Sequence, residues 1–332
     1  MAIVKDAIID IIPAIVLIDV LALDGVFDSG LTALLDVFGT ANELSDGKHP
    51  LRVRTVGVRR HVQTALGMRV PVQSVEVDRP PDVMVAPALG TKTPQALEAA
   101  LQRRDVRDAV ELLRERSQGG VRMAAACTGT FMLAASGSLD GRRATTTWWL
   151  APFFRQLHPH VHLDESRMLV PDDNVVTAGA ALAHLDLALW ILRRHSPSMA
   201  GLVAHYLMMD ERPSQAVYVI SDHLAHSDPM IERFERWARG RLSKGFSLME
   251  AARAIGASER TLARRLERVL GKTPLSYFQD LRIEHAVHRL RTGTASVDAI
   301  AAEVGYADGV TLRALLRRKL GRGVRELRRH DD

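Results

Sequence analysis

The chain has 332 residues, 47% of them hydrophobic and 25% charged, which is enough for two domains and excludes a low-complexity or largely disordered protein. Its single cysteine, Cys127, excludes an intramolecular disulfide framework, so a reducing cytoplasm is the expected compartment. Residues 1–228 hold 22 Lys and Arg against 26 Asp and Glu, and residues 229–332 hold 22 against 13, so we expect a basic C-terminal domain that binds nucleic acid, the alternative being a basic face with no partner.

The first element in the chain is an apolar stretch over residues 7–23. Asp10, Pro13 and Asp19 interrupt it, so we expect a buried strand with an irregular lead-in, and neither a signal peptide nor a membrane partner. Short apolar runs then alternate with helical segments, which predicts an α/β domain with a mostly parallel sheet and helices on both faces. Strands are expected at 14–21, 52–58, 82–86, 121–126 and 174–178, and helices at 31–44, 94–116, 128–135 and 182–194.

Cys127 lies where the fourth of these strands turns into the helix that begins with Thr128. A helix N-terminus lowers the pKa of a thiol and offers backbone N–H groups to an anion, so this elbow could hold a nucleophile or a carboxylate. The alternative is a small buried cysteine that fills a tight turn.

A ligand pocket is expected outside the carboxyl ends of the strands, the usual crevice of open α/β sheets. Trp148 could form an apolar wall of this pocket, although an aromatic at a helix start is also ordinary core. The candidate pocket residues are Asp24, Leu89, Gly90, Cys127, Thr128, Trp148 and Gly179. His158, His160 and His162 are interpreted as a solvated cluster, so neither a metal nor a cofactor is predicted.

Residues 209–228, which include Pro213, are predicted to link a domain over 1–208 to a second domain over 229–332. A flexible linker and a linker that transmits orientation are both compatible with the sequence.

The C-terminal domain contains an internal repeat, in which residues 247–271 match residues 296–321 after one inserted residue. Each copy consists of a short helix, a turn that opens at Gly256 or Gly305, and a longer helix that ends at glycine. The repeat therefore predicts two helix-turn-helix units in an all-α domain.

The longer helix of each copy carries arginines opposite an apolar stripe. Leu262, Leu266 and Val269 form the first stripe, with Ser258 as N-cap, and Leu312, Leu315, Leu316 and Leu320 form the second. Guanidinium groups on the outer face match guanine edges and phosphates. The predicted DNA contacts are Ser258, Arg260, Thr261, Ala263, Arg264 and Arg268, followed by Val310, Thr311, Arg313, Arg317 and Arg318. Because basic residues including Lys319 gather at the end of the second helix, we expect the first unit to specify the sequence and the second mainly to anchor.

A linking helix is expected between the units. Thr273 and Pro274 suit its N-cap and first position, and it ends near Gly293, with Leu275, Phe278, Leu281 and Leu290 facing inward. This helix would hold the recognition helices in successive major grooves, roughly 34 Å apart.

Residues 229–332 resemble the AraC/XylS-type DNA-binding domain. The motif residues are Ile300, Ala301, Val304, Gly305, Tyr306, Leu312, Leu316, Lys319, Gly321 and Arg328. The usual phenylalanines of the second recognition helix are replaced by Leu312 and Leu316, and the usual following proline by Val324. The resemblance implies a transcription regulator whose partners are double-stranded promoter or operator DNA, a second copy of the chain and RNA polymerase.

Residues 14–195 resemble the PfpI-type branch of the class I glutamine-amidotransferase-like superfamily, which implies a flavodoxin-like fold. Catalytic members place a histidine after two threonines, where this chain has Thr147, and an acidic residue where it has Gly30. The chain is therefore expected not to be an enzyme, and its N-terminal domain to sense a small-molecule effector. A purely structural dimerisation role and a cysteine-dependent hydrolase fused to a DNA-binding domain are the alternatives.

Overall fold

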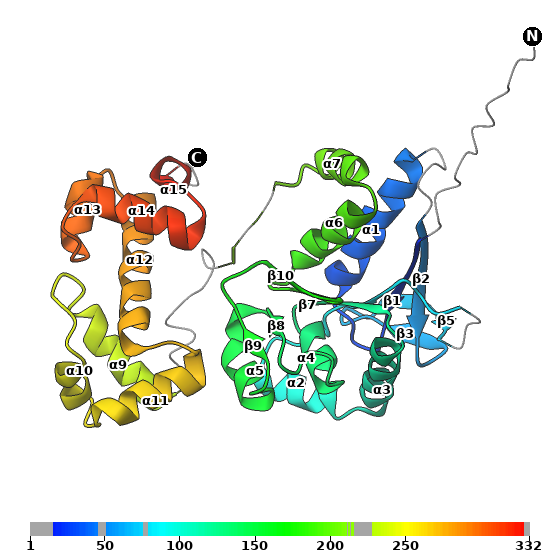
Figure 1. Cartoon of the computed structure of the whole chain (residues 1–332), viewed down its shortest axis with the longest axis horizontal. Coiled ribbons are helices and arrows are strands. Elements are labelled where there is room, and N and C mark those ends of the chain that lie inside the picture. The colour runs from blue at the N-terminus through cyan, green and yellow to red at the C-terminus, as the bar shows by residue number, and fades with distance from the viewer. Residues whose placement is uncertain are drawn as a thin grey trace, which may run out of the picture.

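The computed structural model describes residues 16–45, 51–75, 79–210, 212, 214–215 and 228–328. An α/β domain is followed by an all-α region, as predicted (Figure 1). The expected lead-in before residue 16 and most of the expected linker lie outside the described residues.

The α/β domain is built on a mostly parallel sheet. Within the described residues the sheet has seven strands in the order β10-β11-β7-β6-β1-β2-β5, and every neighbouring pair is parallel except β10 with β11. The strands span Val16–Leu21 (β1), Leu51–Gly57 (β2), Gln73–Ser74 (β5), Val83–Ala86 (β6), Arg122–Ala126 (β7), Leu169–Asp172 (β10) and Val175–Ala178 (β11). The predicted sheet is therefore confirmed.

Helices cover both faces of the sheet because each central strand is apolar on both sides. In β6, Val83 and Val85 pack on one face and Met84 and Ala86 on the other. The first face is covered by Asp28–Leu44 (α1), Ala183–His195 (α6) and Pro197–Tyr206 (α7), and the second by Pro94–Leu101 (α2), Arg104–Gln118 (α3) and Gly129–Ala135 (α4).

One predicted helix is wrong, because residues 94–116 form two helices, α2 and α3. The chain is extended at Arg103 (φ −63°, ψ 146°). The Arg103 guanidinium donates to the backbone oxygen of Asp24 and to the carboxylate of Asp105. Arg103 therefore joins the break between the helices to the loop after β1.

Short elements flank the sheet. They are His61–Gln63 (β3), Arg69–Pro71 (β4), Arg143–Ala144 (β8), Trp148–Leu150 (η1), Ala151–Leu157 (α5) and His162–Leu163 (β9). His160 and His162 are exposed, as expected of a solvated cluster. His158 is half-buried against the Phe154 ring, and burial lowers its pKa, so the cluster prediction is wrong for this residue.

The all-α region has two apolar cores that share one helix. Its helices are Pro229–Arg239 (α9), Leu248–Ala254 (α10), Glu259–Leu270 (α11), Pro274–Thr292 (α12), Val297–Glu303 (α13), Gly309–Leu320 (α14) and Val324–Arg328 (α15). Phe278 and Leu281 of α12 pack into the first core, and Ala286 and Leu290 into the second. The predicted linking helix is confirmed, and no described helix has the length and apolarity needed to cross a bilayer.

Candidate DNA interface and the elbow of the α/β domain

Helix α11 has the N-cap residue and the C-terminal glycine that the sequence predicted. Ser258 Oγ accepts a hydrogen bond from Thr261 N at 3.1 Å, and Gly271 ends the helix in the left-handed conformation (φ 63°) that glycine adopts without strain. Leu262 and Leu266 are fully buried. The arginine-bearing side of α11 therefore faces away from the core.

The outer face of α11 is exposed and positively charged. Arg260, Arg264 and Arg268 are exposed, and within the described part of the chain none of them forms an ion pair. Their neighbour Arg265, by contrast, pairs with the buried Asp228 at the N-cap of α9. The exposed guanidinium groups keep their hydrogen-bond donors available for phosphates or guanine edges.

Helix α14 repeats this arrangement with a different charge pattern. Asp308 caps it by accepting from Thr311 N at 2.7 Å, and Leu312 and Leu316 are fully buried. The predicted contact residues Val310, Thr311, Arg313, Arg317 and Arg318 are all exposed. Lys319 was expected to join the basic residues at the end of this helix. Its ammonium is instead paired with Asp280 of α12.

Arg282 of α12 joins the two units. Its guanidinium donates to Leu242 O at 2.9 Å and to Lys244 O at 2.6 Å, in the segment after α9. The same group stacks on Tyr306, which follows α13, at 5.3 Å from the ring centroid. Arg282 therefore restrains the orientation of one recognition helix relative to the other.

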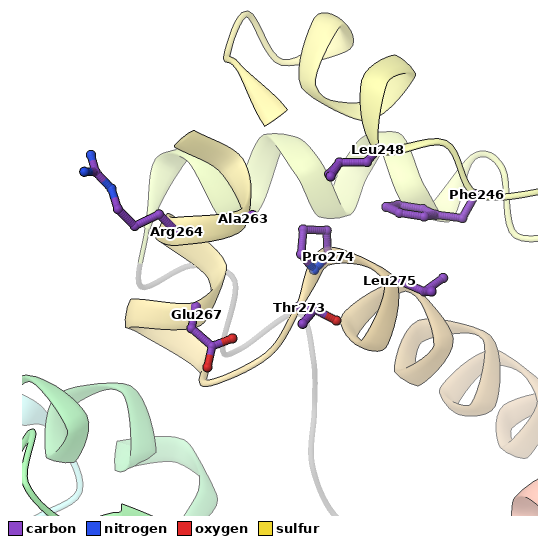
Figure 2. A pocket seen from close by; sticks show the side chains of 8 residues that line it. All are labelled: Phe246, Leu248, Ala263, Arg264, Glu267, Thr273, Pro274 and Leu275. Atoms are coloured by element: carbon purple, nitrogen blue, oxygen red, sulfur yellow. The ribbon is translucent and has the colours of Figure 1, made fainter. Parts of the chain in front are cut away.

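An apolar groove of about 480 Å³ lies beside α11 (Figure 2). It is lined by Phe246, Leu248, Ala263, Arg264, Glu267, Thr273, Pro274 and Leu275. The prediction that Leu275 faces inward is wrong, since its side chain is 48% exposed. Pro274, Phe278 and Leu281 form the buried stripe of α12. Leu275 lies about 100° around the helix axis from this stripe.

Cys127 occupies the predicted elbow between β7 and α4. It has a positive φ of 54°, and its backbone N–H donates to Ala178 O at 2.9 Å. Burial raises the pKa of the thiol to about 12, against smaller lowering effects of the Thr128 backbone and the Thr147 hydroxyl. The expected lowering of the pKa by a helix N-terminus is therefore wrong: loss of solvent outweighs it.

The structure brings some of the predicted pocket residues together. Thr128 Oγ1 donates to Leu89 O at 2.8 Å beside Cys127, and Gly90 N donates at 2.7 Å to Gly25 O, next to Asp24. Gly179 follows β11 and packs against Gln215. Trp148 instead joins the apolar core of the all-α region, so it lies between the two parts of the chain.

A fully buried histidine, His184 of α6, lies beside Gly30. A side-chain carbon added at Gly30 would be 2.7 Å from His184 Nε2. Nε2 accepts from Ala88 N at 3.1 Å, Nδ1–H donates to Ala181 O at 2.6 Å, and burial lowers the pKa of the ring to about 4. Sequence reasoning missed this residue, because nothing near Gly30 in the sequence shows that His184 lies beside it.

The α/β domain contacts the all-α region where α5 meets the C-terminal end of α11 (Figure 1). Arg155 of α5 lies on Gly271, where an added Cβ would be 2.5 Å from Arg155 Nε. Glu165 accepts from Arg155 and lies 3.8 Å from Lys272 Nζ. Burial tends to lower the pKa of Lys272, but Asp280 at 3.0 Å, together with Glu165, raises it. Because Asp280 also pairs with Lys319, a chain of charges runs from α5 to the ends of both recognition helices.

Two family models match separate parts of the chain. The model of the DJ-1/PfpI family matches residues 16–194, and a helix-turn-helix domain model matches residues 251–330. The regulator GbdR of Pseudomonas aeruginosa is 24% identical over 236 residues, which cover 68% of this chain and 64% of GbdR. GlxA of Rhizobium meliloti, also an HTH-type transcriptional regulator, is 27% identical over 204 residues, which cover 59% and 61%.

The fold has counterparts among solved structures. The crystal structure of a protein from Vibrio parahaemolyticus superposes on this chain with a TM-score of 0.51 at 19% sequence identity. The superposition covers 58% of this chain and 100% of the Vibrio chain. The chain spans somewhat less than two thirds of the length of GbdR and GlxA.

Proposed function

The chain belongs to the DJ-1/PfpI family, and because its C-terminal region has the AraC-type helix-turn-helix pattern, we propose that it is a sequence-specific DNA-binding transcription regulator. One observation carries the proposal: α11 and α14 are two capped helices of the same design, each with a buried leucine stripe and exposed arginines outside any described ion pair. Such a pair, restrained by α12, suits successive major grooves of one DNA face.

The two recognition helices take unequal parts in this proposal. Arg260 and Arg264 lie in the first half of α11, where side chains reach base edges. Arg317 and Arg318 lie in the last turn of α14, where they suit phosphate contacts. Helix α11 therefore specifies the sequence and α14 anchors the protein, through the eleven residues predicted above.

The N-terminal domain acts in this proposal as a non-catalytic sensor. Cys127 has a pKa of about 12 and is therefore a neutral thiol near pH 7. Thr147 stands where catalytic members carry histidine, and both ring nitrogens of His184 are engaged by backbone groups. A cysteine-dependent hydrolase would need a thiolate and a base, and its turnover would be lost in Cys127→Ser.

Signals from the sensor reach the DNA-binding region through the contact of α5 with α11. Trp148 packs into the core that also holds Leu266 and Leu270 of α11, and Arg155, Glu165 and Lys272 form the polar part of the contact. We propose that residues 1–208 and 229–332 are separate domains, that the chain forms a homodimer, and that it contacts RNA polymerase when bound to DNA.

A methylation-interference experiment tests the paired use of both helices. The full chain selects a duplex from a random pool, and guanines whose methylation blocks binding are mapped. For each bound chain we expect two clusters of such guanines on one face of the DNA, roughly 10 base pairs apart. A single cluster would mean that only one unit enters a major groove, and the proposal in this form would be wrong.

A further inference from the structure

The side chain of Gln215 is fully buried at the carboxyl edge of the sheet, although it belongs to the segment that leads away from the α/β domain. Its backbone N–H donates to Ser166 O at 3.0 Å, and the hydroxyl of Ser214 donates to the same oxygen at 2.8 Å. Arg212, two residues before Ser214, pairs with Asp186 of α6. The described residues of this segment are thus attached to the crevice in which a ligand was expected.

The NH₂ group of the Gln215 carboxamide lies among three oxygen atoms that can accept hydrogen bonds. Nε2 donates to Thr146 O at 2.8 Å and lies 3.2 Å from both Thr145 Oγ1 and Arg167 O. It also packs on the backbone of Gly179, where any side chain would collide with it. Thr146 Oγ1 donates at 2.7 Å to Cys127 O, so the carboxamide is two hydrogen bonds from the elbow.

The oxygen of the same carboxamide lacks a hydrogen-bond partner among the described residues. Among the described residues, Gln215 Oε1 is buried and has no hydrogen-bond partner. A buried acceptor without a partner destabilises the arrangement. The acceptors of this site therefore suit an NH₂ group, but Gln215 fills the site with its carboxamide oxygen left without a partner.

We propose that this crevice is a binding site for a primary carboxamide, which the chain's own Gln215 fills and which a free small molecule with a carboxamide group takes over. Displacement of Gln215 weakens the attachment of residues 214 and 215 to Ser166. The inference rests on the proposed function, because it identifies the chemical class of the effector that the sensor domain binds.

Acetamide is the matched probe, since it reproduces the atoms that Gln215→Ala removes. The full chain with Gln215→Ala is expected to show a saturable rise in Tm with acetamide, and no rise with acetate, whose charge would face the carbonyl oxygens. Wild-type protein and Ser214→Ala, which both keep the carboxamide, are the controls. Equal responses of all three proteins, or no response of a folded Gln215→Ala variant, would overturn the proposal.

A second measurement uses the wild-type chain and does not depend on that variant. Propionamide, an analogue of the whole side chain, is expected to speed hydrogen exchange of the Gln215 N–H, which Ser166 O protects, whereas propionate leaves it unchanged. Unchanged exchange at concentrations well above the millimolar effective concentration of a tethered group would overturn displacement. Neither experiment contains DNA, so its result is independent of whether the chain regulates transcription.

Discussion

Replacing Arg264 and Arg318 by alanine, one at a time, separates base reading from anchoring. Both side chains are exposed and outside any described ion pair, so neither change opens a cavity or leaves a buried charge. Loss of a bidentate guanidinium–guanine pair at Arg264 costs about 1–3 kcal/mol of discrimination, roughly 5- to 150-fold. Loss of one phosphate contact at Arg318 weakens all sequences alike and reduces the salt slope of log K by about 0.9.

Fluorescence anisotropy with the selected duplex and its single-base variants, over a range of salt concentrations, measures both effects. If Arg260, Arg268, Arg313, Arg317 and Arg318 all contact phosphates, the wild-type slope is about −4.5 for each bound chain. Arg104→Ala is the control, since this arginine is 85% exposed on α3 of the α/β domain. The assignment of roles to α11 and α14 would be refuted if Arg313→Ala cost more specificity than Arg264→Ala.

Three further measurements test the α/β domain and its contact with α11. Cys127 in the native protein should resist iodoacetamide at pH 8, because burial raises its pKa to about 12, and rapid native-state modification would contradict this. His184 has a lowered pKa of about 4, so stability should fall as pH drops below 6.5, by roughly 3 kcal/mol at pH 4; urea unfolding of His184→Gln should lack this part of the pH dependence. Lys272→Met removes a cation between Glu165 and Asp280 and should cost about 1–3 kcal/mol in calorimetry, whereas Lys244→Met, at an exposed lysine, should cost nothing measurable.

Local signals predicted most of the all-α region. The caps Ser258 and Thr273, the glycine ends of the recognition helices and the leucine stripes all depend on neighbours within a few turns. The structure has them at the predicted positions, although Leu315 is only partly buried. Leu275 is the exception, because an apolar residue in the first turn of a helix can lie beside the buried stripe as well as on it.

What the sequence could not predict depends on residues far apart in the chain. Arg103 breaks a continuous helical pattern by reaching Asp24, and the space at Gly30 is explained only once His184 is seen beside it. Cys127 is at the predicted elbow, but its pKa is set by how completely neighbouring elements exclude water. Gln215 is buried at the predicted crevice although it belongs to a segment for which the sequence left open a flexible linker and a linker that transmits orientation.

The central claim, sequence-specific DNA binding, is tested most directly by titrating the purified full chain against the DNA upstream of its own reading frame and against a scrambled duplex of the same composition, at physiological salt. We expect the chain to bind the upstream DNA at least about a thousandfold more tightly than the scrambled duplex. Equal affinities for the two duplexes would contradict it.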